Sequence, residues 1–237
     1  MKMEVAEIMT YLEANGSQGI KNILIKHGIK EPFFGVKVEY LKKIQKKIKK
    51  DYQLAKDLYA TGNADAMYLA GLIADDAKMT KADLQTWVNQ AVSNNISEYT
   101  VPWVATEGQY GFELALEWID DNREYVAAAG WSTLSNIVSF KPDSELDLGV
   151  LRELLNRVEQ TIQSQPNRVR YTMNGFIISL GTYVDALMDE AIATGTKIGT
   201  VFVDQNGTAC KVPVAVDYIE KSRARRKPGM KKKTVKC

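Results

Sequence analysis

The chain has 237 residues, 45% of them hydrophobic and 25% charged, with a formal net charge of +2, as in an ordinary globular protein. One histidine and two cysteines are too few for a structural zinc site, and no glycine-rich phosphate-binding motif occurs, so the sequence predicts neither a metal nor a nucleotide cofactor. Because no signal peptide or 18-residue apolar stretch is present, we expect a cytoplasmic protein without a membrane span.

Apolar residues recur every three to four positions up to about residue 199, in short segments separated by turn residues. A first helix carries Val5 to Leu12, a second begins at the cap Ser17 and ends at Gly28, and a third carries Val38 to Ile48. Further helices are predicted at about 52–60, 63–75, 80–94, 97–107, 110–120, 122–140, 147–164, 167–184 and 186–198.

The third helix carries a basic run opposite its apolar face. Lys42, Lys46, Lys49 and Lys50 lie on one side at helical spacing. Like charges stacked in this way repel one another, which favours an anionic partner. A solvated helix face is the alternative interpretation.

Short helix pairs that repeat every 35–45 residues or so predict an all-α fold, an α-solenoid of HEAT-like antiparallel helix pairs. No single pair can bury its own apolar stripe, so neighbouring pairs must stack. We expect this repeat domain to cover residues 1–199 and to form a concave surface.

The pattern changes after Gly199. Two strand-like segments flank Asn206-Gly207, which is typical of a tight hairpin turn, so a small β-hairpin is expected near residues 200–212. A last helix is predicted from Val214 to about Ser222, and residues 200–222 are expected to pack on the repeats.

The C-terminal tail is strongly basic. Residues 221–237 hold nine Lys and Arg and no acid, whereas residues 1–220 hold 22 Lys and Arg against 29 acids. Such a segment is typical of a disordered, polyanion-binding tail, here predicted for residues 223–237. The tail residues predicted to contact DNA are Arg223, Arg225, Arg226, Lys231, Lys232 and Lys233.

Phe33-Phe34-Gly35-Val36, followed by the lysine-rich run, resembles the opening segment of the AlkD-type DNA alkylation repair proteins, and the similarity extends over most of residues 1–200. The C-terminal run from Asn167 to the tail resembles a divergent branch of that family. The resemblance implies HEAT-like repeats that hold duplex DNA in a basic groove and, in active members, hydrolyse the glycosidic bond of alkylated purines.

Active members carry a tryptophan, an essential aspartate one helical turn later, and an arginine on the next repeat. The matching region here reads Trp103 to Glu107, with glutamate at the acidic position, and no arginine or lysine lies between Glu124 and Phe140. Since a carboxylate stabilises the oxocarbenium-like transition state of base excision, Glu98 and Glu107 are the weak catalytic candidates. The alternative to a catalytic role for Glu98 is a position near a helix N-terminus, where the helix dipole favours an acid. The alternative for Glu107 is an ordinary solvated side chain.

The same resemblance implies aromatic residues along the groove. The candidates are Tyr99, Trp103, Trp131 and Phe176, although burial in the core is the alternative for both tryptophans. Arg168 and Arg170 lie at a predicted helix start, where they either contact phosphates or form an ion pair, for example with Glu159.

Together these features predict a DNA-binding protein that recognises damaged or distorted duplex DNA and has weak or absent N-glycosylase activity. The alternative is a HEAT-type protein-interaction scaffold without a nucleic-acid function. A third interpretation is binding to RNA.

Overall fold

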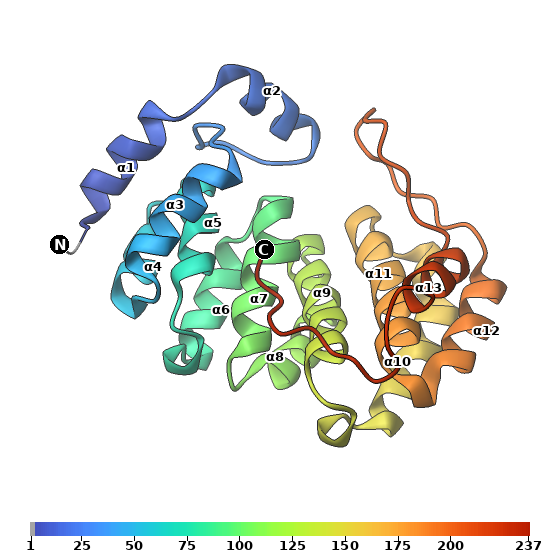
Figure 1. Ribbon diagram of the computed structural model, residues 1–237. Helices are drawn as coiled ribbons and strands as arrows, with labels where there is room; N and C mark the ends of the chain where they lie inside the picture. Colours follow the sequence, from blue (N-terminus) through green and yellow to red (C-terminus); the bar gives the residue numbers. More distant parts are fainter. Residues whose placement is uncertain (1–2) are drawn as a thin grey trace.

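The computed structural model describes residues 3–237, which form a curved row of antiparallel helices (Figure 1). This confirms the predicted all-α fold of helical repeats. The α-helices of the described residues are α1 (Val5–Ala14), α2 (Gln18–Lys26), α3 (Val38–Ile48), α4 (Tyr52–Ala60), α5 (Ala64–Ile73), α6 (Lys81–Gln90), α7 (Val101–Glu107), α8 (Gly111–Trp118), α9 (Glu124–Phe140), α10 (Leu148–Thr161), α11 (Asn167–Tyr183), α12 (Met188–Ile198) and α13 (Ala215–Arg223).

Side-chain caps fix where several helices begin. The Ser17 hydroxyl accepts a hydrogen bond from the Ile20 amide at the start of α2, and the Asp51 carboxylate does the same for Leu54 at the start of α4. The predicted helix at 97–107 is divided: a π-helical turn, Ile96–Thr100, precedes α7, and Pro102 lies in the first turn of α7.

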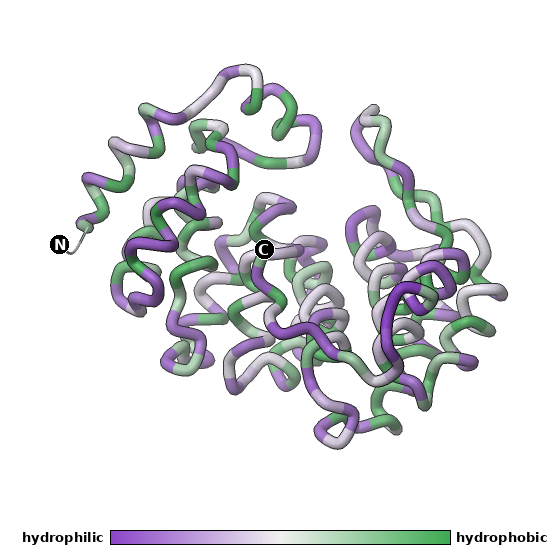
Figure 2. The backbone as a smooth tube through the Cα atoms, in the orientation of Figure 1, coloured by the Kyte–Doolittle hydropathy of each residue, from purple (hydrophilic) through white to green (hydrophobic). Residues whose placement is uncertain are grey.

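The hydrophobic core consists of two large clusters, one among α1 to α9 and one among α8 to α13. Helix α9 contributes to both, with Val126 in the first and Trp131 in the second. Gly130 lets α9 approach α8 closely, because a Cβ there would lie 2.8 Å from the Ile119 amide nitrogen. Figure 2 shows hydrophilic and hydrophobic residues alternating along the helices, as amphipathic stacking requires. Among residues 3–237, no helix has the length and apolar character to cross a membrane.

The predicted β-hairpin is wrong in part. The turn forms, because Asn206 and Gly207 have φ of 52° and 71° and the Thr208 amide donates to Gln205 at 3.0 Å, but residues 200–212 contain no strand. The side chain of Asn167 bonds both the amide and the carbonyl of Asp204, at 2.7 and 2.9 Å. The segment before the turn therefore hydrogen-bonds to α11, through Asp204, rather than to the segment after the turn. The segment projects beyond the row at the upper right of Figure 1.

The structure also differs from the expectation of a disordered tail. The C-terminal segment leaves α13 and crosses in front of α11, α9 and α7 (Figure 1, red). Val235 is 9% exposed and belongs to the first core cluster, and the Lys232 amide donates to the carbonyl of Ser139 at 2.8 Å. We call residues 230–237 the docked tail.

Candidate nucleic-acid interface

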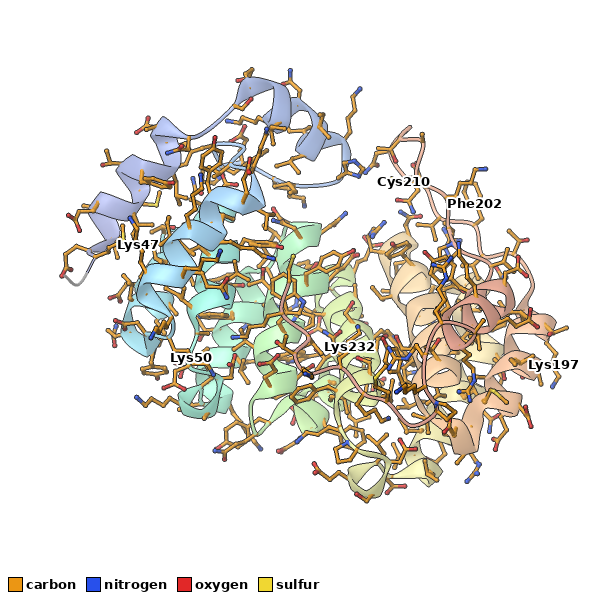
Figure 3. All side chains as sticks on the ribbon, in the orientation of Figure 1. Lys47, Lys50, Lys197, Phe202, Cys210 and Lys232 are labelled. Atoms are coloured by element: carbon orange, nitrogen blue, oxygen red, sulfur yellow. The ribbon has the colours of Figure 1, made fainter. Side chains whose placement is uncertain are left out.

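A pocket of about 290 Å³ lies where the two ends of the helical row come together. One wall is the end of α2 and the loop after it, the floor is the π-helical turn and the start of α11, and the other wall is the loop at 205–211. Figure 3 shows Cys210 on that loop, on the side that faces α2. The residues that line the pocket are Leu24, Lys26, His27, Ile29, Asn94, Asn95, Glu98, Tyr99, Arg168, Tyr171, Gln205, Asn206, Cys210 and Lys211.

The floor of the pocket is a bidentate ion pair between Glu98 and Arg168. The guanidinium Nε and Nη2 donate to the two carboxylate oxygens, each at 2.6 Å, and the two side chains are 3% and 17% exposed. Burial raises the pKa of Glu98, and the hydrogen bonds from Arg168 oppose that rise. Both carboxylate oxygens are therefore engaged, so Glu98 is not a free base. The predicted partner Glu159 instead pairs with Lys197.

Two tyrosines stand beside this ion pair. The Arg168 guanidinium lies 4.3 Å from the ring centroid of Tyr171, and Tyr99 is 46% exposed, so its ring is open to a ligand. Partial burial, together with Tyr171 and Glu98, raises the pKa of Tyr99 to about 12. Its hydroxyl therefore stays protonated at neutral pH and can donate a hydrogen bond.

The other three predicted groove aromatics lie in the core. Trp103, Trp131 and Phe176 are 5%, 1% and 0% exposed. Trp131 packs against Phe176 with ring centroids 5.4 Å apart, and Trp103 meets the edge of Tyr68 at 5.2 Å. The structure thus places Tyr99 alone of the four at a surface where a base could stack.

Glu107, the second catalytic candidate, lies beneath the docked tail. Its Oε1 accepts hydrogen bonds from the Val235 amide at 2.9 Å and from the Thr234 hydroxyl. Glu107 is the last residue of α7, whereas Glu98 lies in the π-helical turn before that helix. The two carboxylates are therefore at opposite ends of the stretch from Ile96 to Glu107. The structure gives Glu107 an anchoring contact and brings it to no site that includes Glu98.

Several tail cations bind the carbonyl ends of helices. Lys231 Nζ donates to Val138 of α9 and Tyr183 of α11, each at 2.8 Å, and pairs with Asp143 at 2.7 Å. Arg223 Nη1 donates to Gly181 of α11 at 3.2 Å. Cations at helix C-termini are favoured because the unpaired carbonyls there carry partial negative charge. These residues therefore hold the C-terminal segment in place.

The lysine helix and the docked tail meet at one buried acid. Asp76, 2% exposed, is 3.2 Å from Lys50 Nζ of the α3 end and 2.6 Å from Lys236 Nζ of the tail. Around this contact lies a hollow of about 400 Å³ whose lining includes Lys46, Lys49 and Lys50. Lys42 is not among its lining residues, so three of the four predicted lysines come together here. Figure 3 shows Lys50 and Lys47 on this end of the molecule and Lys232 on the tail.

The remaining predicted cations are dispersed. Arg170 lies in α11, and its Nε is buried without a hydrogen-bond partner among the described residues. Arg225 and Lys233 are exposed. Arg226 and Lys232 share the ring of Tyr183, as described below.

Sequence reasoning missed Asp76, Lys236 and Tyr171. Asp76 lies between two lysines only because α3 and the tail pack together, and no local pattern signals this. Lys236 belongs to the recognised basic run, but its burial depends on the docking of Val235. Tyr171 lies three residues after Arg168 in α11, and this helical spacing, which puts the two on one face, was the available signal.

The fold and the basic elements define a HEAT-like helical repeat protein. Residues 8–219 match the family described as DNA alkylation repair enzyme. The chain is 33% identical to the uncharacterized protein Lin0241 of Listeria innocua over 92% of its own length and 97% of that protein's. It is also 33% identical to the uncharacterized protein Lmo0209 of Listeria monocytogenes, over 93% and 98% of the two chains.

A solved structure matches with a TM-score of 0.90 and 33% identity, covering 99% of this chain and 100% of the other. It represents "a new family of proteins related to the HEAT-like repeat DNA glycosylases with affinity for branched DNA structures". The chain therefore belongs to the DNA alkylation repair family, as the sequence motifs predicted.

Proposed function

We propose that this protein binds DNA whose duplex is distorted, damaged or branched, and that it releases alkylated bases weakly or not at all. The observation that carries the proposal is the meeting of its two basic segments. Lys46 of α3, and Lys49 and Lys50 just beyond the end of that helix at Ile48, line one hollow with Lys236 of the tail. A surface that gathers cations from distant parts of the chain suits the phosphate backbone.

The curved shape supports a preference for non-linear DNA. The pocket at the ends of the row and the basic hollow near α3 involve different helices, so two DNA arms could contact the protein at separate places. The solved relative with affinity for branched DNA has the same fold over the whole chain, which supports the same substrate class here.

The hydrogen-bond partners of the two candidate carboxylates support weak or absent release of alkylated bases. Glu98 is neutralised by Arg168, and Glu107 is bonded to the tail. Both oxygens of Glu98 are paired with Arg168, so that carboxylate is not free to stabilise positive charge on a sugar, and Glu107 is held to the tail through Oε1.

Fluorescence anisotropy tests the proposal with four probes of equal nucleotide number: a four-way junction, a linear duplex, a duplex with an abasic site and a duplex with an alkylated base. We expect tighter binding to the junction or the lesion-containing duplexes than to the intact duplex, with an affinity that falls steeply as salt rises. Equal affinity for all probes would contradict the preference. No binding at all by a folded protein would favour a protein-interaction scaffold.

A further inference from the structure

Two of the tail cations that have no acidic partner lie against the same aromatic ring. Lys231, Lys236 and Arg223 are each engaged by carbonyls and carboxylates. Arg226 and Lys232, like Lys221, Arg225, Lys227 and Lys233, form no ion pair with any acid of residues 3–237. The acid nearest to Arg226 in the adjoining pocket, Asp185, is paired with Arg223, so the charges of Arg226 and Lys232 are available to an external anion.

Both cations lie on one aromatic ring. The Arg226 guanidinium carbon is 4.0 Å from the centroid of the Tyr183 ring and Lys232 Nζ is 5.5 Å from it. Tyr183 is the last residue of α11, so the ring sits at the end of a rigid helix. Desolvation, and after it the nearby charge of Arg226, lower the pKa of Lys232, although its side chain keeps an exposed surface.

The Arg226 side chain and the backbone at Lys232 are both held by hydrogen bonds. Arg226 donates to the Met230 carbonyl, and the amide of Lys232 itself bonds Ser139 of α9 at 2.8 Å. Between them, Lys231 is fixed to α9 and α11. The segment that carries both charges is therefore positioned before any ligand arrives, and ordering it upon binding costs little.

We propose that Arg226 and Lys232, held on Tyr183 by the docked tail, form a binding site for a phosphodiester group of the DNA backbone. This inference rests on the proposed function and adds a specific contact to it. A guanidinium offers two parallel donors to phosphate oxygens, and an adjacent ammonium adds a compact second charge. The docked tail is thus a folded part of the DNA-binding surface.

The test is the double substitution Arg226→Gln/Lys232→Gln. The matched control is Arg152→Gln/Lys197→Gln, which removes one arginine and one lysine from exposed pairs with Glu190 and Glu159. With a fluorescent four-way junction, we expect the first variant to bind about tenfold more weakly and its salt slope to fall by about 2, while the control stays near the wild type. Equal losses in both variants would overturn the site, because net charge alone would then explain them.

A second variant, Glu107→Ala/Val235→Asn, tests whether docking matters, because it removes two anchors of the tail and no cation. Hydrogen exchange of residues 230–237 reports release of the tail. We expect junction affinity to fall although the protein has lost a negative charge. A released tail with undiminished affinity would overturn the requirement for a docked site.

Inorganic phosphate, titrated alone by calorimetry, distinguishes a free-anion site from a backbone site. Loss of phosphate binding in Arg226→Gln/Lys232→Gln without any loss of junction affinity would overturn the DNA assignment. Different results would contradict the proposed function and the phosphate site. A wild type that binds no DNA contradicts the proposed function, whereas normal binding by the double variant contradicts this site alone.

Discussion

Glu98 and Arg168, the ion pair in the floor of the pocket, show how far single residues of the candidate site can be predicted from the sequence. Each was identified as a candidate, but their pairing was not, because they lie 70 residues apart and meet only when repeats stack. The spacing of a helix predicts which face a residue occupies. It does not say which distant side chain will lie opposite that face.

Replacing Glu98 with glutamine is expected to destabilise the fold. The substitution leaves the Arg168 guanidinium, 17% exposed, without its counter-charge in the pocket floor. Removing one partner of a buried ion pair costs about 3–5 kcal/mol. Urea denaturation should show a loss of that order, whereas Glu190→Gln, which breaks an exposed pair with Arg152, should cost less than about 1 kcal/mol. Equal small losses would contradict the buried pairing.

The aromatic residues give a second expectation at this scale. Trp131→Ala should lower the free energy of unfolding by about 3–5 kcal/mol, because its ring is 1% exposed and packs on Phe176. Tyr99→Ala should change stability far less and should weaken binding to the four-way junction, since that ring is open to solvent. Thermal melts and anisotropy separate the two effects. A Tyr99 variant with full junction affinity would remove that ring from the binding surface.

At the scale of elements, periodicity located the helices of the repeats well but misjudged the C-terminal segments. Composition indicates disorder for a run of nine cations, and it carries no information about Val235 and Thr234, which dock that run on the helices. The turn at Asn206-Gly207 was predictable because it is local chemistry. Whether the segments on either side of this turn pair with each other or with Asn167 is decided by packing against α11.

Deleting residues 230–237 is expected to destabilise the protein by about 2–3 kcal/mol. The deletion exposes the Val235 contact surface and removes Lys236 from the buried carboxylate of Asp76. It also removes the Lys231 donor from the carbonyl ends of α9 and α11. Urea denaturation measures the loss, and hydrogen exchange should rise at the ends of these two helices. An unchanged midpoint with unchanged exchange would show that the tail does not dock in solution.

Substituting Arg225 and Lys227 with glutamine is the control for this deletion. Both side chains are exposed and precede the docked tail, so these substitutions remove charge from the C-terminal region without removing any contact of residues 230–237. We expect their stability to match the wild type within about 0.5 kcal/mol.

At the scale of the whole molecule, the helical row was predictable from the repeat of apolar stripes, since each stripe requires a neighbouring helix. A concave surface was predicted as well, but the degree of curvature was not, because it depends on how closely each pair of helices approaches, as Gly130 allows between α8 and α9. That curvature brings the loop at 205–211 towards the end of α2, and a pocket forms between these segments, the π-helical turn and the start of α11. The catalytic candidates consequently lie in surroundings that no local motif specifies.

The wild-type protein is expected to release 7-methylguanine and 3-methyladenine from alkylated duplex DNA no faster than a no-protein control. Both candidate carboxylates already have partners: Glu98 pairs with Arg168, and Glu107 accepts hydrogen bonds from the tail through Oε1. Without a preorganised charge partner, about 3–4 kcal/mol of transition-state stabilisation is absent. Single-turnover assays measure base release directly, with Glu98→Gln and Glu107→Gln compared at a temperature where each variant is folded. Rapid release that one substitution abolishes would identify the catalytic carboxylate. Rapid release unaffected by both would point to assistance from the DNA phosphates, and either result would contradict this prediction.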